Sequence, residues 1–326
     1  MRSILLLFLL PMASVSHAAH YCVASDAGFR SALAAAAQSP EADEIRLVRK
    51  TIPLQDSIYA SVKIAGDLQL RGGYASDCNS RLDPTHVTRI DGGGWNIALQ
   101  LRRDADLDIE QLHVHGLYWL RIEDNLADTE GPHGQVRISR SAFREFGLGP
   151  HIGLMRHHAR ISNSLFADND TGVSYHSPQN ASGSRPPTFE VVNSTLAHND
   201  VGLWVLAGPG GSPDVLPSIV NSIVAENLHA DIVLEQPTIV RYSIYRQLVT
   251  ELTGALHPKS EFNLGSAPKL DAKYVPRADS PALDSGDDRA LEFPTMADFA
   301  MRPRKVGAHV DRGALERQGG SGFPLP

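Results

Sequence analysis

The chain has 326 residues, of which 42% are apolar and 21% are charged, so it can fill a hydrophobic core. Acidic residues outnumber basic ones by 37 to 30, which gives a net charge of −7. An acidic chain is a poor partner for nucleic acid, and we exclude that class of function. The length suits about two ordinary domains or a single solenoid, because solenoids grow by repetition.

The first 18 residues have the features of an export signal. Arg2 supplies a positive charge, and residues 4–10 form an apolar run that is too short to span a bilayer. Ser16 and Ala18 are small residues, as expected before a cleavage site that follows Ala18. Since no later apolar run reaches about 20 residues, we expect no membrane span. The protein is predicted to be secreted, periplasmic or held at a bacterial cell envelope.

The two cysteines, Cys22 and Cys78, are the only ones in the sequence. An oxidising compartment favours a disulfide between them. Closing this loop of about 57 residues would stabilise the fold by roughly 4 kcal/mol in the chain-entropy model. We therefore expect a structural bond near the N-terminal end rather than a catalytic thiol or a metal site.

A short helix is predicted over about residues 25–38. Ser25 or Asp26 can cap its N-terminus, the segment is rich in alanine, and Pro40 ends it. The open end of a solenoid must be covered, and this helix is the expected N-terminal cap.

A serine recurs at the same place in five short segments. These serines are Ser141, Ser164, Ser194, Ser222 and Ser243. Their spacing runs from 21 residues (Ser222 to Ser243) to 30 residues (Ser164 to Ser194). Asparagines follow five residues after three of them, at Asn169, Asn199 and Asn227. The earlier segment 107–112 fits the same frame, with Gln111 in the serine column.

The repeat predicts an all-β fold. Alternate apolar residues indicate short strands, and Asn, Asp and Gly at their ends indicate turns. A unit this short cannot bury its own apolar side, so stacked units form parallel sheets. Helical patterns between the strands are absent, which disfavours a βαβ sheet.

We predict a right-handed parallel β-helix of seven to nine turns over residues 19–268. A C-terminal closure over 269–317 and a flexible tail over 318–326 follow it. Loops are expected at 176–187 and 207–217, where the repeat is interrupted. The recurring asparagines are expected to hydrogen-bond to one another along the solenoid axis.

Three groups of residues resemble a known family. They are 70–74 with Cys78, Arg81 and 88–92; the repeat itself; and 280–286 with Arg302-Pro303 and 310–316. On these residues the chain resembles the pectin-lyase-like superfamily of right-handed parallel β-helix proteins. More narrowly, it is similar to exported bacterial proteins with a choice-of-anchor Q domain. The resemblance implies the fold and export, and members mostly lack an assigned reaction. The family usually has glycine before the Arg-Pro pair, where this chain has Met301.

A binding function is the first hypothesis. Trp119 and Trp204 lie near strand ends, where their rings could stack on sugars. A basic concentration that includes Arg121, Arg137 and Arg156 could meet an anionic glycan. His113 and His115 are two residues apart and share a strand face, so they are further ligand-binding candidates. A metal site would need at least one more ligand, and we assign none.

A polysaccharide lyase or glycoside hydrolase is the alternative. A lyase needs a base and often calcium, whereas a hydrolase needs two carboxylates about 5 to 10 Å apart. Neighbouring turns lie about 4.8 Å apart, so Asp170 and Asp200 form the best candidate pair. Asp168 is a weaker candidate, since all three aspartates also fit a plain turn-forming role.

Carboxylates also gather at 284–288 and 311–316, where calcium is possible but matches no known loop spacing. We favour a structural closure there, with Arg302 or Arg304 paired to Asp311 or Asp284. The expected function is non-catalytic binding of carbohydrate or a cell-surface partner. We expect a monomer, because a β-helix exposes few sheet edges.

Overall fold

The computed structural model describes residues 18–58, 63–81, 87–102, 104–124, 134–153, 157–176, 188–207, 216–291 and 297–318. Several predictions lie outside these residues: the export signal before residue 18, the tail beyond 318, Arg156 and most of the two loops at 176–187 and 207–217. In the described part of the chain, no helix is long and apolar enough to cross a membrane.

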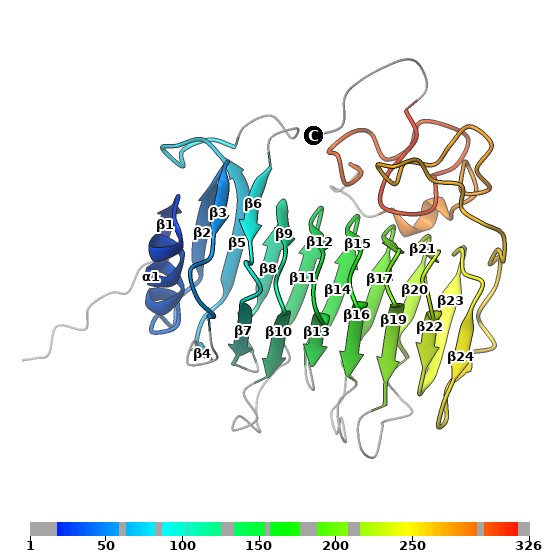
Figure 1. Cartoon of the computed structure of the whole chain (residues 1–326), viewed down its shortest axis with the longest axis horizontal. Helices are drawn as coiled ribbons and strands as arrows, with labels where there is room; N and C mark the ends of the chain where they lie inside the picture. The colour runs from blue at the N-terminus through cyan, green and yellow to red at the C-terminus, as the bar shows by residue number, and fades with distance from the viewer. Residues whose placement is uncertain are drawn as a thin grey trace, which may run out of the picture.

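The chain winds into a parallel β-helix of three sheets, as predicted (Figure 1). Sheet A contains β1 (His20–Val23), β2 (Asp43–Val48), β5 (Leu68–Tyr74), β8 (Leu107–Glu110), β11 (Gln135–Ser139), β14 (His158–Ser162), β17 (Phe189–Val192), β20 (Ser218–Val220), β23 (Pro237–Arg241) and β25 (Ala255–Leu256). Sheet B contains β3 (Thr51–Pro53), β6 (Thr88–Asp91), β9 (Leu112–His115), β12 (Ala142–Arg144), β15 (Leu165–Ala167), β18 (Thr195–Ala197) and β21 (Ile223–Ala225). Sheet C contains β4 (Lys63–Ile64), β7 (Asn96–Leu101), β10 (Trp119–Asp124), β13 (Gly149–Gly153), β16 (Thr171–His176), β19 (Val201–Leu206), β22 (Ala230–Leu234) and β24 (Leu248–Thr250).

Each turn of the solenoid adds one strand to each sheet, in the order A, B, C. Among the described residues, seven turns contribute to all three sheets and an eighth contributes β23 and β24, within the predicted range. The inward residues stack in register, as in the sheet A column of Ile109, Ile138, Ile161 and Val191. All four are buried, so stacking buries the apolar side that a single turn leaves open.

The frame serines form a buried ladder at the corner between sheets A and B. The backbone N–H of each serine donates to Oγ of the serine one turn on, over 3.2–3.3 Å from Ser141 to Ser243. The residue before each serine has a positive φ, 48° at Asn163 for example. The Gln111 prediction is wrong by one residue: Gln111 occupies this positive-φ position, and Leu112 occupies the serine column. Ile138 opens the frame of the next turn, and it pairs with Ile109, which faces the core. The frame of this turn therefore starts at Ile109 and its serine column falls at position 112.

The recurring asparagines form a second ladder, at the corner between sheets B and C, as expected. Asn169 Nδ2 donates to Asn199 Oδ1, and Asn199 Nδ2 donates to Asn227 Oδ1, each over 3.0 Å. Asn227 ends the ladder with a 3.0 Å bond to Asp231 Oδ1. All three amides are buried, so these bonds satisfy polar groups that water does not reach.

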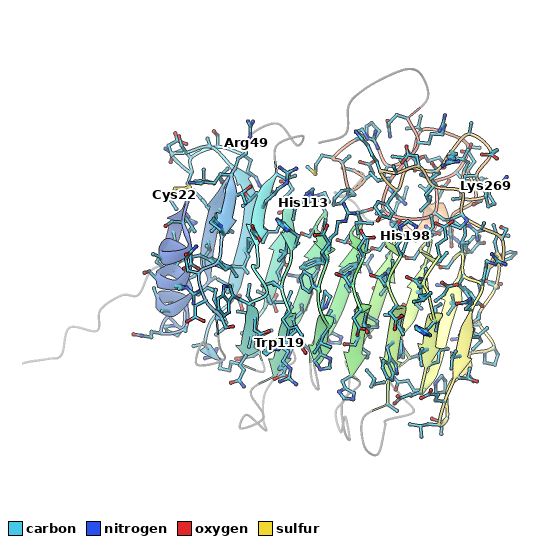
Figure 2. All side chains as sticks on the ribbon, in the orientation of Figure 1. Cys22, Arg49, His113, Trp119, His198 and Lys269 are labelled. Atoms are coloured by element: carbon cyan, nitrogen blue, oxygen red, sulfur yellow. A yellow bond between two sulfur atoms is a disulfide. The ribbon has the colours of Figure 1, made fainter. Side chains whose placement is uncertain are left out.

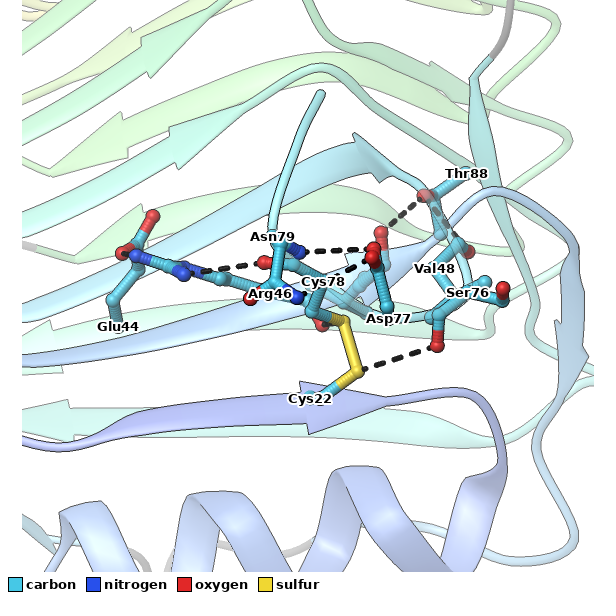
Figure 3. The surroundings of a disulfide bond; sticks show 10 residues. Cys22, Glu44, Arg46, Val48, Ser76, Asp77, Cys78, Asn79 and Thr88 are labelled. Atoms are coloured by element: carbon cyan, nitrogen blue, oxygen red, sulfur yellow. Dashed lines mark hydrogen bonds and ion pairs between the residues drawn. A yellow bond between two sulfur atoms is a disulfide. The ribbon is translucent and has the colours of Figure 1, made fainter. Parts of the chain in front are cut away.

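The N-terminal end is covered by the predicted helix, α1 (Asp26–Ala36). Ser25 Oγ accepts a hydrogen bond from the Gly28 N–H over 3.2 Å and caps the helix. The predicted disulfide joins Cys22 on β1 to Cys78 after β5, with the two Cα atoms 5.6 Å apart (Figure 3). Arg46 donates to the carbonyl oxygen of Cys78 over 3.1 Å, which ties the first turns together.

The C-terminal segment, residues 269–291 and 297–318, folds back over the outer face of sheet B (Figure 1). The Gly313 N–H donates to the carbonyl oxygen of Asn221 over 2.7 Å, and the Ala314 N–H donates to Thr195 Oγ1 over 2.9 Å. Tyr274 and Leu315 pack on small outward residues of β12, β15 and β18. The segment is therefore a cover that is bonded to the solenoid.

The charge pairing predicted inside this cover is wrong. Arg302 pairs with Asp298 over 3.0 Å. Arg304 is fully buried and donates to the carbonyl oxygens of Asp311 and Gly313 over 2.7 and 2.6 Å. Carbonyl oxygens of a buried irregular segment have no strand partners and must find other donors. The Arg304 guanidinium is such a donor.

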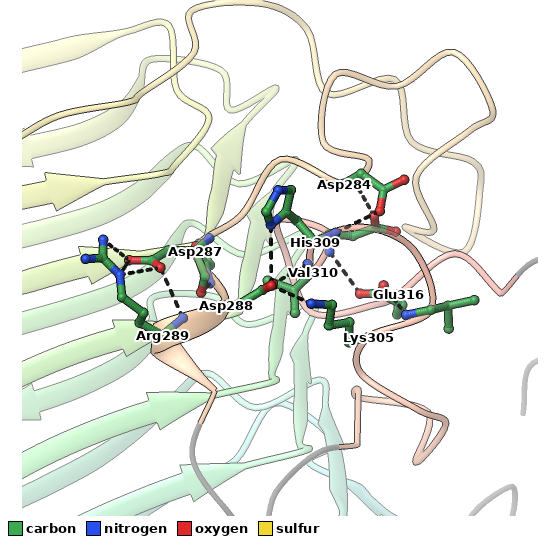
Figure 4. Close-up of polar contacts among 11 residues, drawn as sticks. Asp284, Asp287, Asp288, Arg289, Lys305, His309, Val310 and Glu316 are labelled. Atoms are coloured by element: carbon green, nitrogen blue, oxygen red, sulfur yellow. Dashed lines mark hydrogen bonds and ion pairs between the residues drawn. The ribbon is translucent and has the colours of Figure 1, made fainter.

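The carboxylates of the cover are occupied by backbone N–H groups and cations (Figure 4). Asp288 accepts from the Val310 N–H over 3.0 Å and from Lys305 Nζ over 2.5 Å. Glu316 accepts from the N–H groups of Val306 and Asp311. Burial raises the pKa of Glu316 to about 7. Across the described ranges, no three acidic, histidine or cysteine side chains are disposed to hold a metal ion.

Candidate functional site

The outer face of sheet C carries a hollow of about 480 Å³, here named the sheet C hollow. It spans β10, β13, β16 and β19. The side chains that give it chemical character are Trp119, Arg121, His151, Asp170, Ser174 and Trp204. They point outward because their neighbours Leu120, Ile122, Val173 and Val205 face the core.

The strand register places four of these residues in one row. Arg121 pairs with His151, His151 with Ser174, and Ser174 with Trp204. Beside this row, Trp119 pairs with Gly149 on the next turn. Gly149 has φ 87°, and a Cβ there would lie 1.8 Å from the Thr171 carbonyl oxygen. Glycine is therefore required, because it lets the backbone of β13 lie close to that of Thr171 on the next turn.

His151 lies in the middle of the hollow. Its Nδ1 is 2.8 Å from Ser174 Oγ, and its ring meets that of His176 edge-on at 5.7 Å. Burial, with help from the positive charges of His176 and Arg121, lowers the pKa of His151 to about 4. The imidazole is thus neutral near pH 7. Together the ring and the hydroxyl offer both a donor and an acceptor to a ligand.

The two tryptophans are held in place by polar neighbours. The Arg121 guanidinium lies over the Trp119 ring, 5.3 Å from its centroid, and Arg121 Nε is 3.0 Å from Glu123 Oε1. Trp204 Nε1 donates to Glu235 Oε1 over 3.1 Å. Preorganised rings of this kind lose little freedom when a ligand stacks on them.

The three candidate aspartates separate in space. The pairing of Thr171 with Val201 puts Asp170 and Asp200 on adjacent turns, as the repeat predicted. Asp170 lines the hollow, whereas the carboxylate of Asp200 contacts His229 instead. Asp168 lies at the sheet B corner, where it contacts Arg144 over 2.5 Å and accepts from Tyr274 Oη over 3.2 Å. Asp168 therefore anchors the C-terminal segment.

The remaining candidates lie elsewhere. Arg137 lies on sheet A, where it contacts Asp106 and Asp108 at 3.4 and 3.2 Å. His113 and His115 share the outer face of β9, as expected, but on sheet B. The structure therefore brings Trp119, Arg121, Trp204 and Asp170 together and separates the others from them.

His151, Ser174 and Gly149 were missed by sequence reasoning. A signal for Ser174 was present, because Ser174 and Trp204 each lie five residues after a ladder asparagine. On two successive turns, the fifth residue after the ladder asparagine therefore points outward from sheet C. His151 gives no such signal, since its turn has no asparagine at the ladder position: Phe146 precedes it there.

Comparisons with known proteins found no matching family model, no similar curated protein and no similar solved structure. The three parallel sheets agree with the β-helix that the sequence resemblance implied. They are compatible with any family that shares this fold.

Proposed function

We propose that this protein is an exported, non-catalytic β-helix protein of the choice-of-anchor Q type that binds carbohydrate at the sheet C hollow. One observation carries the proposal. Two tryptophans, Trp119 and Trp204, flank a row of polar side chains on one flat face. They lie three strand steps apart, β10 to β19, or about 14 Å along the axis.

The chemistry of this face suits a sugar chain. The tryptophan rings offer flat apolar surfaces for the CH faces of sugar rings. His151 and Ser174 lie on the two strands between the rings, Arg121 lies beside Trp119, and all three offer hydrogen bonds to hydroxyl or carboxylate groups. A solenoid repeats its surface at every turn, so an extended ligand can follow the axis.

The carboxylates favour binding over hydrolysis. Of the described residues that line the hollow, Asp170 is the one carboxylate. Its expected partner Asp200 contacts His229. A hydrolase of the usual kind places two carboxylates across the scissile bond, so the hollow lacks half of that arrangement.

The disulfide supports export. A bond between Cys22 and Cys78 is stable in a secreted or envelope compartment and is rare in a reducing cytosol. This agrees with the predicted signal at residues 1–18.

The test is a binding panel of acidic and neutral polysaccharides, read by tryptophan fluorescence. Two of the three tryptophans line the hollow, so binding should change the emission. Trp204→Ala should weaken binding about tenfold or more. Phe262→Ala, which removes an exposed ring at another corner, should leave binding unchanged.

Three outcomes would contradict the proposal. They are an absence of binding across the panel, equal loss in the two variants, and turnover. Unsaturated products would make the protein a lyase, and new reducing ends would make it a hydrolase.

A further inference from the structure

A second hollow, of about 420 Å³, lies where the C-terminal segment meets sheet B. We name it the seam hollow. The solenoid contributes Arg89, His113, His115 and Arg144 from β6, β9 and β12. The segment contributes Lys273, Tyr274 and Phe299. None of these residues lines the sheet C hollow, and Figure 2 shows Trp119 and His113 on opposite sides of the solenoid.

The seam hollow forms where the outward residues of sheet B change from small and apolar side chains to arginine and histidine. Along one outward row, Arg89 pairs with His113 and His113 pairs with Ala142. Beyond Ala142 the row continues with Leu165 and Thr195, which the segment covers. Along this row the cover therefore ends at His113, on which Phe299 stacks, and the exposed Arg89 lies beyond it.

Two aromatic rings of the segment form a wall of the hollow. Phe299 stacks on His113, with ring centroids 5.2 Å apart and planes 12° apart. The Arg144 guanidinium lies over the Tyr274 ring at 5.5 Å. Further apolar lining comes from Ala142, Leu165 and Leu315. A bare inorganic ion would gain little from such a wall, whereas an organic body would pack on it.

The charge of the hollow is positive. Arg89, Arg144 and Lys273 line it, and Glu145 is the one carboxylate among the described lining residues. Arg144 is matched by Asp168. Arg89 is exposed and forms no ion pair within the described ranges.

His113 reports this positive field. Burial comes first, followed by the charges of Arg89, Arg144 and His115, and together they lower the pKa of His113 to about 4. Tyr274, Lys273 and Glu145 are the other titratable groups around the hollow. An anion placed among these cations would favour the charged imidazole and raise the same pKa.

We propose that the seam hollow binds a small organic carboxylate, with its carboxylate toward Arg89 and its apolar body against the wall that Tyr274 and Phe299 form. The volume lies within the usual range of small-molecule sites, about 300 to 1,000 Å³. This site is separate from the sheet C hollow and does not depend on glycan binding there. A ligand held by both partners would also stabilise the docked segment, because it binds only when the two surfaces meet.

The test titrates the full chain with D-galacturonate, D-galactose and inorganic sulfate at constant ionic strength. The readout is the ring NMR signal of His113. Galacturonate should raise the pKa of His113 by one unit or more and bind at least tenfold more tightly than sulfate. Galactose should leave the signal unchanged.

Two variants locate the site. Arg89→Ala should weaken galacturonate binding about tenfold and raise the pKa of His113 in the free protein. Since Arg89 is exposed, its thermal unfolding should match that of the parent. Arg121→Ala, in the sheet C hollow, should leave the galacturonate-dependent shift of the His113 signal unchanged, because that signal reports the seam hollow alone.

The proposal is overturned if galacturonate does not perturb His113, or if galactose or sulfate binds as well as galacturonate. It is also overturned if Arg121→Ala weakens the binding detected at His113 as much as Arg89→Ala does. A negative result here leaves the polysaccharide panel for the sheet C hollow unaffected.

Discussion

Sheets B and C have the same strand geometry, but the outer face of sheet B is covered by the C-terminal segment and that of sheet C is open to solvent. On sheet B, the outward residues of β15, β18 and β21 are Leu165, Ala167, Thr195, Ala197, Ile223 and Ala225, all buried under the C-terminal segment. On sheet C, the outward residues of β10 and β19 include Arg121 and Trp204, which keep contact with solvent. Small apolar residues on an outer face thus mark a covered sheet, and mixed aromatic and polar residues mark a face left open to ligands.

The largest expected effect comes from placing a charge under the cover. Ala197→Asp would bury an unpaired carboxylate against Tyr274 and Leu315. It should lower the free energy of unfolding by about 3 kcal/mol or more. Ser174→Asp, the matched change on sheet C, should cost at most about 0.5 kcal/mol. Urea unfolding measures both, and equal losses would mean that the two faces do not differ as described.

Breaking the ladder that joins the two sheets should cost less. Asn199 accepts from Asn169 and donates to Asn227 and to the Phe166 carbonyl oxygen. Asn199→Ala should lower the free energy of unfolding by about 2 kcal/mol, because buried partners lose their bonds. Asn79→Ala, at an exposed turn, is the control and should change stability by no more than about 0.5 kcal/mol. A loss for Asn199→Ala as small as that of the control would show that water replaces the ladder.

The cover should respond to pH in a direction set by Glu316. Its pKa is about 7 in the folded protein and lies near 4.5 when exposed. The folded state therefore holds the proton more tightly. The stabilisation is complete below about pH 4.5 and is lost as the pH rises through about 7. Asp311, whose pKa burial also raises, acts in the same direction.

We expect the melting temperature of the parent, measured relative to that of Glu316→Gln, to fall by a few degrees between pH 5 and pH 8. The two proteins are compared because His113 and His151, whose pKa burial lowers to about 4, act in the opposite direction in both of them. By contrast, His151 stays neutral above about pH 5, so its titration should not change binding at the sheet C hollow over the same range. A difference between the two proteins that stays constant from pH 5 to pH 8 would show that Glu316 does not titrate with a raised pKa.

The smallest effect concerns Met301. Its φ is 61°, in the left-handed region that favours glycine, which explains why the similar family usually has glycine there. Met301→Gly should raise the free energy of unfolding by about 1 kcal/mol, as relief of strain outweighs the added freedom of the unfolded chain. Thermal unfolding measures it, with Met301→Ala as the control that keeps the strain. A destabilised glycine variant would show that the Met301 side chain packs usefully.

The fold could be predicted because each turn has a similar short sequence pattern that can be recognised without knowing the long-range contacts. The column of Ser164 holds a serine in five turns and the column of Asn169 an asparagine in three, and apolar residues alternate along the strands. The sheet C hollow was predicted in part, since Trp119 and Trp204 are outward residues of known chemistry. His151 was not, because only the register aligns it with Arg121 and Ser174.

The seam hollow could not be predicted from the repeat. It depends on Phe299 reaching His113 across most of the chain, and no local pattern encodes that contact. A weaker signal existed in β15, β18 and β21, where all three residues are buried. Runs without alternation indicate strands that are covered on both sides.

The bonds of Gly313 and Ala314 to β18 and to the turn before β21 imply an order of assembly. Those turns must be wound before the last residues have a surface to dock on. Until then, Ile223 and Ala197 stay in water as part of an apolar stripe. A chain released without its final fifty residues would keep that stripe exposed, and such stripes drive self-association. The far end of the sequence therefore shields the apolar outer face of the middle turns from self-association.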